Sequence, residues 1–135
     1  MNTIMPDVIR IISAKPFRDS FTDNDARDSV KASFLEYKIT NNNIQDGWSF
    51  GRDVPYHRPN AALQAEMQHV HLLTVDSYNE DKQQYNNTSD YHLAYCFNDD
   101  HSIYCLLDML THEDAESMDI MLSLSELAER FKTSF

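Results

Sequence analysis

The chain has 135 residues, of which 22 are Asp or Glu and 11 are Lys or Arg, so its formal net charge at pH 7 is −11. This length suits one domain with its own core, and 41% hydrophobic against 24% charged residues excludes a disordered chain. No apolar run is long enough to span a membrane, no secretory signal opens the chain, and two cysteines are too few for a disulfide scaffold. We therefore expect a single cytoplasmic domain over residues 1–135.

The first half of the chain predicts one strand and two helices. Val8–Ile12 is rich in β-branched residues and indicates a strand. Thr22 is placed to cap a helix that ends at the asparagines 41–43. Its apolar side chains recur at helical spacing: Ala26, Val30, Phe34 and Tyr37. Residues 44–59 are broken by Gly, Pro and Asp and predict a loop, after which a short helix is expected over 60–67.

The second half predicts three strands and a helix. His69–Val75 is a strand, and the polar segment 76–90 is a candidate mobile loop. Tyr91–Phe97 and Ser102–Leu110 form a hairpin around the turn at 98–101. Thr111 begins one long helix that runs to Lys132. Its inner face is expected to consist of Ala115, Met118, Met121, Leu122, Leu124, Leu127, Ala128 and Phe131.

This order of elements predicts an α+β fold, a two-layer sandwich in which helices pack on one face of an antiparallel sheet. Strand alternation assigns the apolar set to the covered face: Val70, Leu72, Ala94, Cys96, Ile103, Cys105 and Leu107. The open face would then carry His69 and His71 together with several tyrosines, including Tyr91, Tyr95 and Tyr104.

That combination of side chains favours RNA chemistry. A histidine can exchange a proton with a ribose 2′-hydroxyl or with a leaving oxygen. Exposed tyrosines such as Tyr91 and Tyr104 can contact unpaired bases. Arg52 can neutralise charge that develops on a phosphate, with Asp53 holding its guanidinium in a two-pronged ion pair.

Three alternatives compete with this interpretation. The tyrosines can be core packing, and the Arg52–Asp53 pair can brace a loop. His69 and His71 can ligate a metal ion with Asp90, His92 or Asp108 as a third ligand, although no CxxC or HExxH spacing supports it and we expect no metal.

The acidic charge suggests a further class, a non-catalytic protein that docks a basic partner or mimics nucleic acid. Residues 1–58 have eight acids and eight bases, whereas residues 59–135 have fourteen acids and three bases. Such a surface repels RNA at long range, so contact with RNA would need the early bases.

Several short motifs resemble, in order and spacing, those of the YafO-type toxins. The resemblance extends over roughly residues 30 to 135. The matching segments are Phe34–Lys38, Phe50–Asp53, His69–Leu72, Thr88–Asp90, His92–Cys96 and the C-terminal stretch Met118–Phe131. One departure is Asn87, at a position where the family pattern leads us to expect Arg.

The resemblance implies a toxin of a type II toxin–antitoxin system, silenced by an antitoxin encoded beside it. It implies a RelE-like sandwich and a ribosome-dependent mRNA endoribonuclease that inhibits translation without a metal or other cofactor. The motif positions carried over are Arg52, Asp53, His69, His71, Asp90 and Tyr95. Of these, either histidine would be the general acid or base and Arg52 would stabilise the phosphate. Tyr95 would stack on a base or relay a proton, and Asp90 would orient a base or order its loop.

Overall fold

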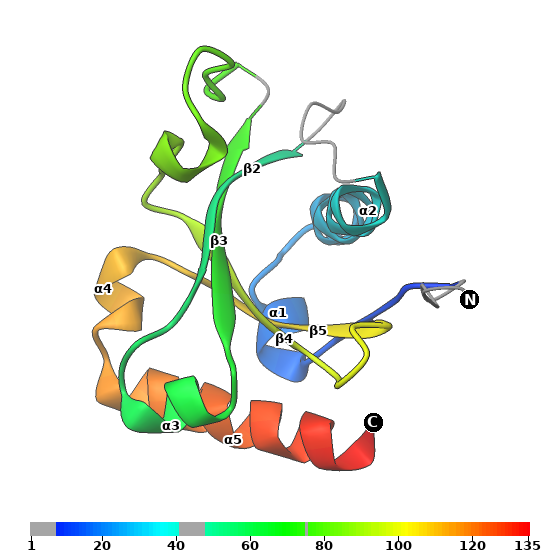
Figure 1. Cartoon of the computed structure of the whole chain (residues 1–135), viewed down its shortest axis with the longest axis vertical. Helices are drawn as coiled ribbons and strands as arrows, with labels where there is room; N and C mark the ends of the chain where they lie inside the picture. Colours follow the sequence, from blue (N-terminus) through cyan, green and yellow to red (C-terminus); the bar gives the residue numbers. More distant parts are fainter. Residues whose placement is uncertain (1–7, 41–47, 75) are drawn as a thin grey trace, which may run out of the picture.

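The computed structural model describes residues 8–40, 48–74 and 76–135. Five strands form one sheet in the order β1-β5-β4-β3-β2 (Figure 1). The strands are β1 (Arg10–Ser13), β2 (Trp48–Pro55), β3 (Gln68–Thr74), β4 (His92–Phe97) and β5 (Ile103–Leu110). The α+β class is confirmed, and the fold is consistent with a RelE-like sandwich. The sheet is mixed rather than antiparallel, because β1 lies parallel to β5 at one edge.

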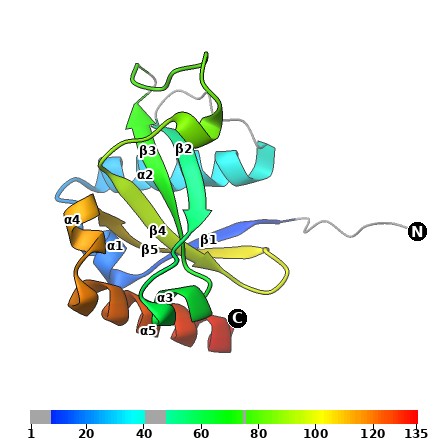
Figure 2. The same ribbon diagram turned by 60° about the vertical axis from the view of Figure 1, so that its left-hand side comes forward.

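Helices cover both faces of the sheet, so the prediction of one open face was wrong. The helices α1 (Lys15–Asp19) and α2 (Asn24–Thr40) lie on one face, and α3 (Asn60–Gln64) and α5 (Met118–Ser134) lie on the other. Figure 1 shows α2 and α5 on opposite sides of the strands, and Figure 2 shows α3 beside α5. Two hydrophobic cores result, one under each helical layer.

The face assignment of β3 was also wrong. Val70 and Leu72 belong to the core under α2, not to the core that contains Ala94 and the two cysteines. In the β3–β4 ladder His69 is paired with Ala94 and His71 with His92, so these side chains share the α5 face. The sequence predicted the alternation within each strand, but it did not contain the register between β3 and β4.

The tyrosines expected on an open face have different environments. Tyr95 and Tyr104 are buried, with 1% and 7% of their surface exposed, in the core under α2. Their rings contact Phe34, at centroid distances of 5.0 and 5.8 Å. Stacking on an RNA base requires an exposed ring, which rules out both residues as stacking groups. Only Tyr91 of the three is exposed, at 43%.

Several boundaries differ from those expected. Residues 48–55, expected as loop, form β2, which pairs with β3 along the sheet edge. The helix α2 begins after Asp23, whose Oδ1 accepts the Asp25 N–H at 2.9 Å, so Asp23 rather than Thr22 caps it. The asparagines 41–43 lie outside the described residues.

The C-terminal helix is divided in two. Thr111 forms a capping box with Asp114 and begins the short α4 (His112–Ala115). Ser117 then accepts the Ile120 N–H and begins α5, so a second cap interrupts the expected single helix. The break changes which side chains face the sheet, and Met118 and Leu122, expected inside, are 57% and 44% exposed.

The segment 76–90 is folded onto β2 rather than detached from the sheet. It contains the 3-10 turn η1 (Gln84–Asn86). Asn87 is 3% exposed and holds the segment together, because its side chain accepts the Asn79 N–H and donates to the Asn79 and Gln83 carbonyls. None of the helices in the described ranges is long and apolar enough to cross a membrane.

Candidate functional site

Four histidine rings converge on the α5 face of the sheet. His69 and His71 come from β3, His92 from β4, and His112 from the first position of α4. The ring centroids of neighbouring pairs are 5.1 to 5.9 Å apart. The β3–β4 register brings the rings of His69, His71 and His92 together. The capping box at Thr111 then places His112 beside them.

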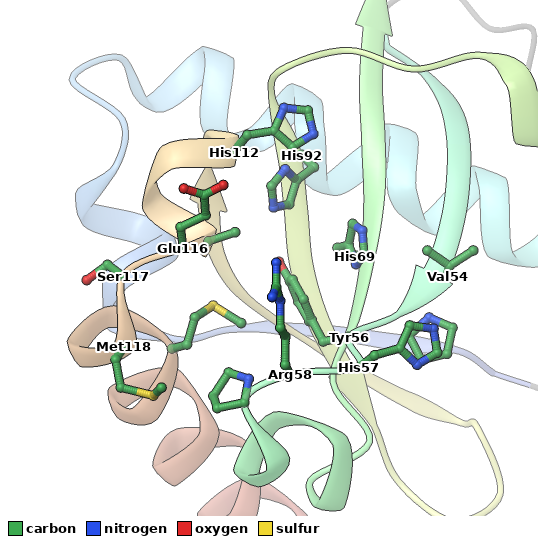
Figure 3. Close-up of a pocket in the computed structure, with 14 residues that line it drawn as sticks. Val54, Tyr56, His57, Arg58, His69, His92, His112, Glu116, Ser117 and Met118 are labelled. Atoms are coloured by element: carbon green, nitrogen blue, oxygen red, sulfur yellow. The ribbon is translucent and has the colours of Figure 1, made fainter.

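A cleft of about 780 Å³ opens beside the cluster. Its polar lining includes Tyr56, Arg58, His69, His92, His112 and Glu116, and its apolar lining includes Val54, Pro59, Met118 and Met121. Figure 3 shows Arg58 and Tyr56 rising into the middle of this space from the segment after β2. The volume is typical of small-molecule and nucleotide sites.

A β-bulge in β2 places Arg52 beside His71. Phe50 pairs with Leu72 and Asp53 with Val70, so Gly51 and Arg52 together face His71. A side chain at position 51 would clash, since a Cβ there would lie 2.0 Å from the Asn87 carbonyl oxygen. The same carbonyl accepts the Arg52 N–H at 2.8 Å. Glycine is therefore required for the close contact that fixes the bulge.

The guanidinium of Arg52 is held by η1. Its Nε donates to the Tyr85 carbonyl oxygen at 2.9 Å, and its central carbon lies over the Tyr85 ring, 4.1 Å from the ring centroid. Within the described part of the chain it forms no ion pair. Burial is the main cause of the lowered pKa of His69 and of His71, and the positive charge of Arg52 adds to it. The cation thus remains available for an anionic ligand.

Burial keeps three of the four histidines, His69, His71 and His92, neutral. Desolvation lowers the pKa of His69 and of His92 to about 4, and the neighbouring histidine rings add to the effect at both positions. The backbone of Asp90 opposes the change in the pKa of His92. Burial also lowers the pKa of His71 from its ordinary value, although a hydrogen bond to Ser89 opposes the change. At pH 7 these three rings are neutral.

The backbone of Ser89 holds one nitrogen of His71. The Ser89 carbonyl oxygen lies 2.7 Å from Nδ1, and the Ser89 N–H lies 2.9 Å from the same atom. When Nδ1 carries a proton it donates to the carbonyl, and Nε2 is then the basic nitrogen. The ring keeps that partner when Nε2 also becomes protonated.

Asp90 positions His112. Its Oδ1 accepts the backbone N–H of His112 at 3.2 Å and lies 2.9 Å from the ring Nδ1. Both side chains are exposed. Asp90 was predicted to orient a base or order its loop, and the structure places it where it can orient His112.

Asp53 and Tyr95 lie on the α2 face of the sheet, opposite to the face that carries the histidines. Asp53 accepts hydrogen bonds of 2.7 Å from the hydroxyls of Tyr37 and Tyr95, and Lys38 Nζ lies 3.5 Å from its carboxylate. The predicted two-pronged pair with Arg52 does not form, because the bulge turns Asp53 toward α2. This network ties α2 to β2.

Three residues of the site were not singled out from the sequence as RNA-contacting groups: Tyr56, His92 and His112. Arg58 was expected only as one of the eight early bases that RNA contact would need. His92 entered only as a possible metal ligand. Register information for β3 and β4 would have found it, since it is the direct partner of His71. No group of three or more His, Cys, Asp or Glu among the described residues has the geometry to hold a metal ion.

Comparison with known families identifies a match over most of the chain. The model of a family described as toxin YafO, type II toxin–antitoxin system, matches residues 35–133. The matched region contains β2 to β5, the histidine cluster and the cleft. No curated protein and no solved structure matches the chain.

Proposed function

Because this chain belongs to the YafO toxin family of type II toxin–antitoxin systems, for which a cognate antitoxin is the partner, we propose that it cleaves mRNA on the ribosome as a metal-independent endoribonuclease. The observation that carries the proposal is the pairing of neutral His71 with Arg52 across the β-bulge. The enzyme would act in the cytoplasm, where translating ribosomes supply its substrate.

The reaction needs one base, one acid and one cation. The ribose 2′-oxygen loses its proton and attacks the adjacent phosphorus, and the bond from phosphorus to the 5′-oxygen breaks. The 5′-oxygen then takes up a proton, which leaves a 2′,3′-cyclic phosphate and a 5′-hydroxyl. Negative charge grows on the phosphoryl oxygens in the transition state, where a fixed cation is most effective.

His71 is the proposed base. In the tautomer whose Nδ1 proton is donated to the Ser89 carbonyl, Nε2 can take the 2′-proton. His112 is the proposed acid, held by Asp90 with its ring centroid 5.7 Å from that of His71. Two groups at this separation can serve the attacking and leaving oxygens of one phosphate. Arg52 is the proposed phosphate contact.

We assign His69 a supporting role, although its ring is more exposed than that of His71 and lines the cleft. Its ring stacks on Tyr56 at a centroid distance of 4.3 Å, and its Nδ1 is buried. Of the two histidines predicted as acid or base, His71 has the partners that proton transfer requires.

The chemistry of the product ends tests this proposal. Ribosomes programmed with a short mRNA are incubated with the purified protein, and the fragments are analysed for 2′,3′-cyclic phosphate and 5′-hydroxyl ends. His71→Gln and His112→Gln should each reduce cleavage at least about 100-fold. His101→Gln, in the exposed β4–β5 turn, is the matched control. Fragments with 5′-phosphate ends, or full activity of His71→Gln, would overturn the mechanism.

A further inference from the structure

We propose that the part of the cleft next to Tyr56 and His92 binds one unstacked RNA base. These two side chains would recognise the edge of the base. This inference rests on the proposed function and deepens it, since it assigns residues that choose where the RNA is cut. The base would belong to a nucleotide next to the cleaved phosphate.

Unsatisfied polar atoms point to a ligand at this place. Within the described chain, the hydroxyl of Tyr56, Nδ1 of His69 and both ring nitrogens of His92 are buried and make no hydrogen bond of ordinary geometry, although the Asp90 backbone lies close enough to His92 to affect its pKa. His92 is 1% exposed and Tyr56 is 6% exposed. Buried polar atoms without partners are rare because leaving them unpaired is unfavourable. Three lining residues of one cleft have such atoms, which is the observation from which we infer a polar ligand here.

The chemistry of these atoms suits a nucleobase. A neutral imidazole has one N–H donor and one acceptor nitrogen, and the Tyr56 hydroxyl both donates and accepts. The Watson–Crick edge of every base also presents donors and acceptors side by side, and proteins read that edge in unpaired RNA. A phosphate would offer acceptors only, and an aliphatic ligand would offer neither.

The walls of the cleft suit a flat aromatic ring. Pro59, Met118 and Met121 provide apolar surface. Arg58 enters the space from the segment after β2 (Figure 3) and is exposed. Within the described chain it forms no ion pair. A guanidinium plane can stack on a base, so Arg58 can close the subsite over its ligand.

The subsite adjoins the proposed reaction centre. The ring centroid of His92 lies 5.9 Å from that of His71 and 5.7 Å from that of His112. A base in contact with His92 therefore belongs to a nucleotide that flanks the phosphate between these two rings. Recognition here would select the cleavage site rather than drive the bond cleavage.

Tyr56→Phe tests the specificity. The substitution removes only the unpartnered hydroxyl, so the protein should unfold at no lower a temperature than the wild type. Cleavage positions are mapped on ribosomes translating a pool of mRNAs, and the distribution of bases around the cuts is compared. We expect Tyr56→Phe to change the base preference at one position next to the cut at least about threefold. Tyr78→Phe, which removes a tyrosine hydroxyl from the segment 76–90 outside the cleft lining, should leave the distribution unchanged.

Direct binding separates this inference from the proposed function. The imidazole NMR signals of His69 and His92 are followed while adenosine, guanosine, cytidine and uridine monophosphates are added, with the phosphate at either the 3′ or the 5′ position. At least one nucleotide should shift the His92 signals, and ribose 5-phosphate should not.

If the wild type cleaves RNA but Tyr56→Phe has the wild-type distribution, the base subsite is wrong and the function stands. A response to ribose 5-phosphate equal to that of the nucleotides would also overturn it. If no RNA is cleaved but a nucleotide shifts His92, the proposed function fails and the base site remains.

Discussion

The surroundings of Arg52 hold its planar, positively charged guanidinium in a fixed position. Its Nε bonds the Tyr85 carbonyl, and its guanidinium lies over the Tyr85 ring. A lysine cannot make both contacts, because it lacks the planar fork. We expect Arg52→Lys to reduce cleavage at least about tenfold and Arg52→Ala about 100-fold or more. Arg130→Lys, near the exposed end of α5, should change nothing, and equal activities of all these variants would contradict the assignment.

His71 gives the reaction a characteristic pH dependence. Its pKa is lowered by burial, so the ring remains neutral, and therefore basic, at pH values below the ordinary histidine pKa of about 6.5. We expect kcat/KM on ribosomes to fall on the acid side with a midpoint below about 6.5. The measurement uses a series of buffers at constant ionic strength. An acid limb centred above about pH 7 would exclude a desolvated histidine as the base.

The sequence identified residues that could take part in the reaction, but it did not show which side chains they contact. Arg52 and His71 were predicted and lie together, because β2 and β3 are neighbours in the sheet. Asp53 was adjacent to Arg52 in sequence but was turned away by a bulge. His112 could not be linked to His71 without the fold, since the two are far apart in the chain and a capping box sets their contact.

The bulge in β2 is the element that connects the segment 76–90 to the site. Gly51 lies against the Asn87 backbone, where a Cβ would come within 2.0 Å of the carbonyl oxygen. Gly51→Ala must push η1 off the strand, which removes the Arg52–Asn87 hydrogen bond and the Tyr85 contacts. We expect a loss of about 2–3 kcal/mol of stability together with a larger loss of cleavage than instability alone explains. Urea unfolding and the cleavage assay measure the two effects, and wild-type stability of the Gly51→Ala variant would show that the contact is not tight.

In the same segment, Asn87 stands at the position where the resemblance to the family leads us to expect Arg. Asn87 is buried and bonds Asn79 and Gln83, so it organises the segment instead of contacting phosphate. Elements with strong periodicity or hairpin signals, such as α2 and the β4–β5 pair, were predicted correctly. β2 was missed because Gly, Pro and Asp weaken its local pattern, and its strand conformation depends on pairing with β3.

The whole molecule should lose stability in mild acid through its histidines. His69 and His92 have pKa values of about 4 when folded and about 6.5 when unfolded, so the unfolded chain binds protons first. Stability should therefore fall as the pH drops from about 6.5 to about 4, by at most about 1.4 kcal/mol per pH unit for each ring.

Urea unfolding of wild type and His92→Gln at about pH 7 and about pH 4.5 measures this loss. The substitution should reduce the difference between the two pH values, whereas His101→Gln should preserve it. An equal acid sensitivity in His92→Gln and wild type would show that His92 is not responsible.

The net charge of −11 affects which partners the whole molecule can attract. Lys38 is bound to Asp53 inside the protein, and Lys15 and Arg27 pair with neighbouring acids. Within the described residues the other five early bases form no ion pair: Arg10, Arg18, Lys31, Arg52 and Arg58. Arg52 and Arg58 lie beside the histidine cluster and bring two positive charges to this region, which also contains the carboxylates of Asp90 and Glu116. The alternative of an acidic protein that only docks a basic partner would not require these two residues near an unsatisfied histidine.

Primer extension on a defined mRNA, with and without ribosomes, tests the central claim most directly. Wild-type protein, the Arg52→Ala/His71→Ala double variant and His101→Gln are assayed in parallel at equal concentration. We predict cuts by wild type and His101→Gln only when ribosomes are present, and none by the double variant. Undiminished cutting by the double variant would contradict the assigned site. The absence of cuts in every lane would contradict the ribonuclease itself and favour a toxin that acts by binding.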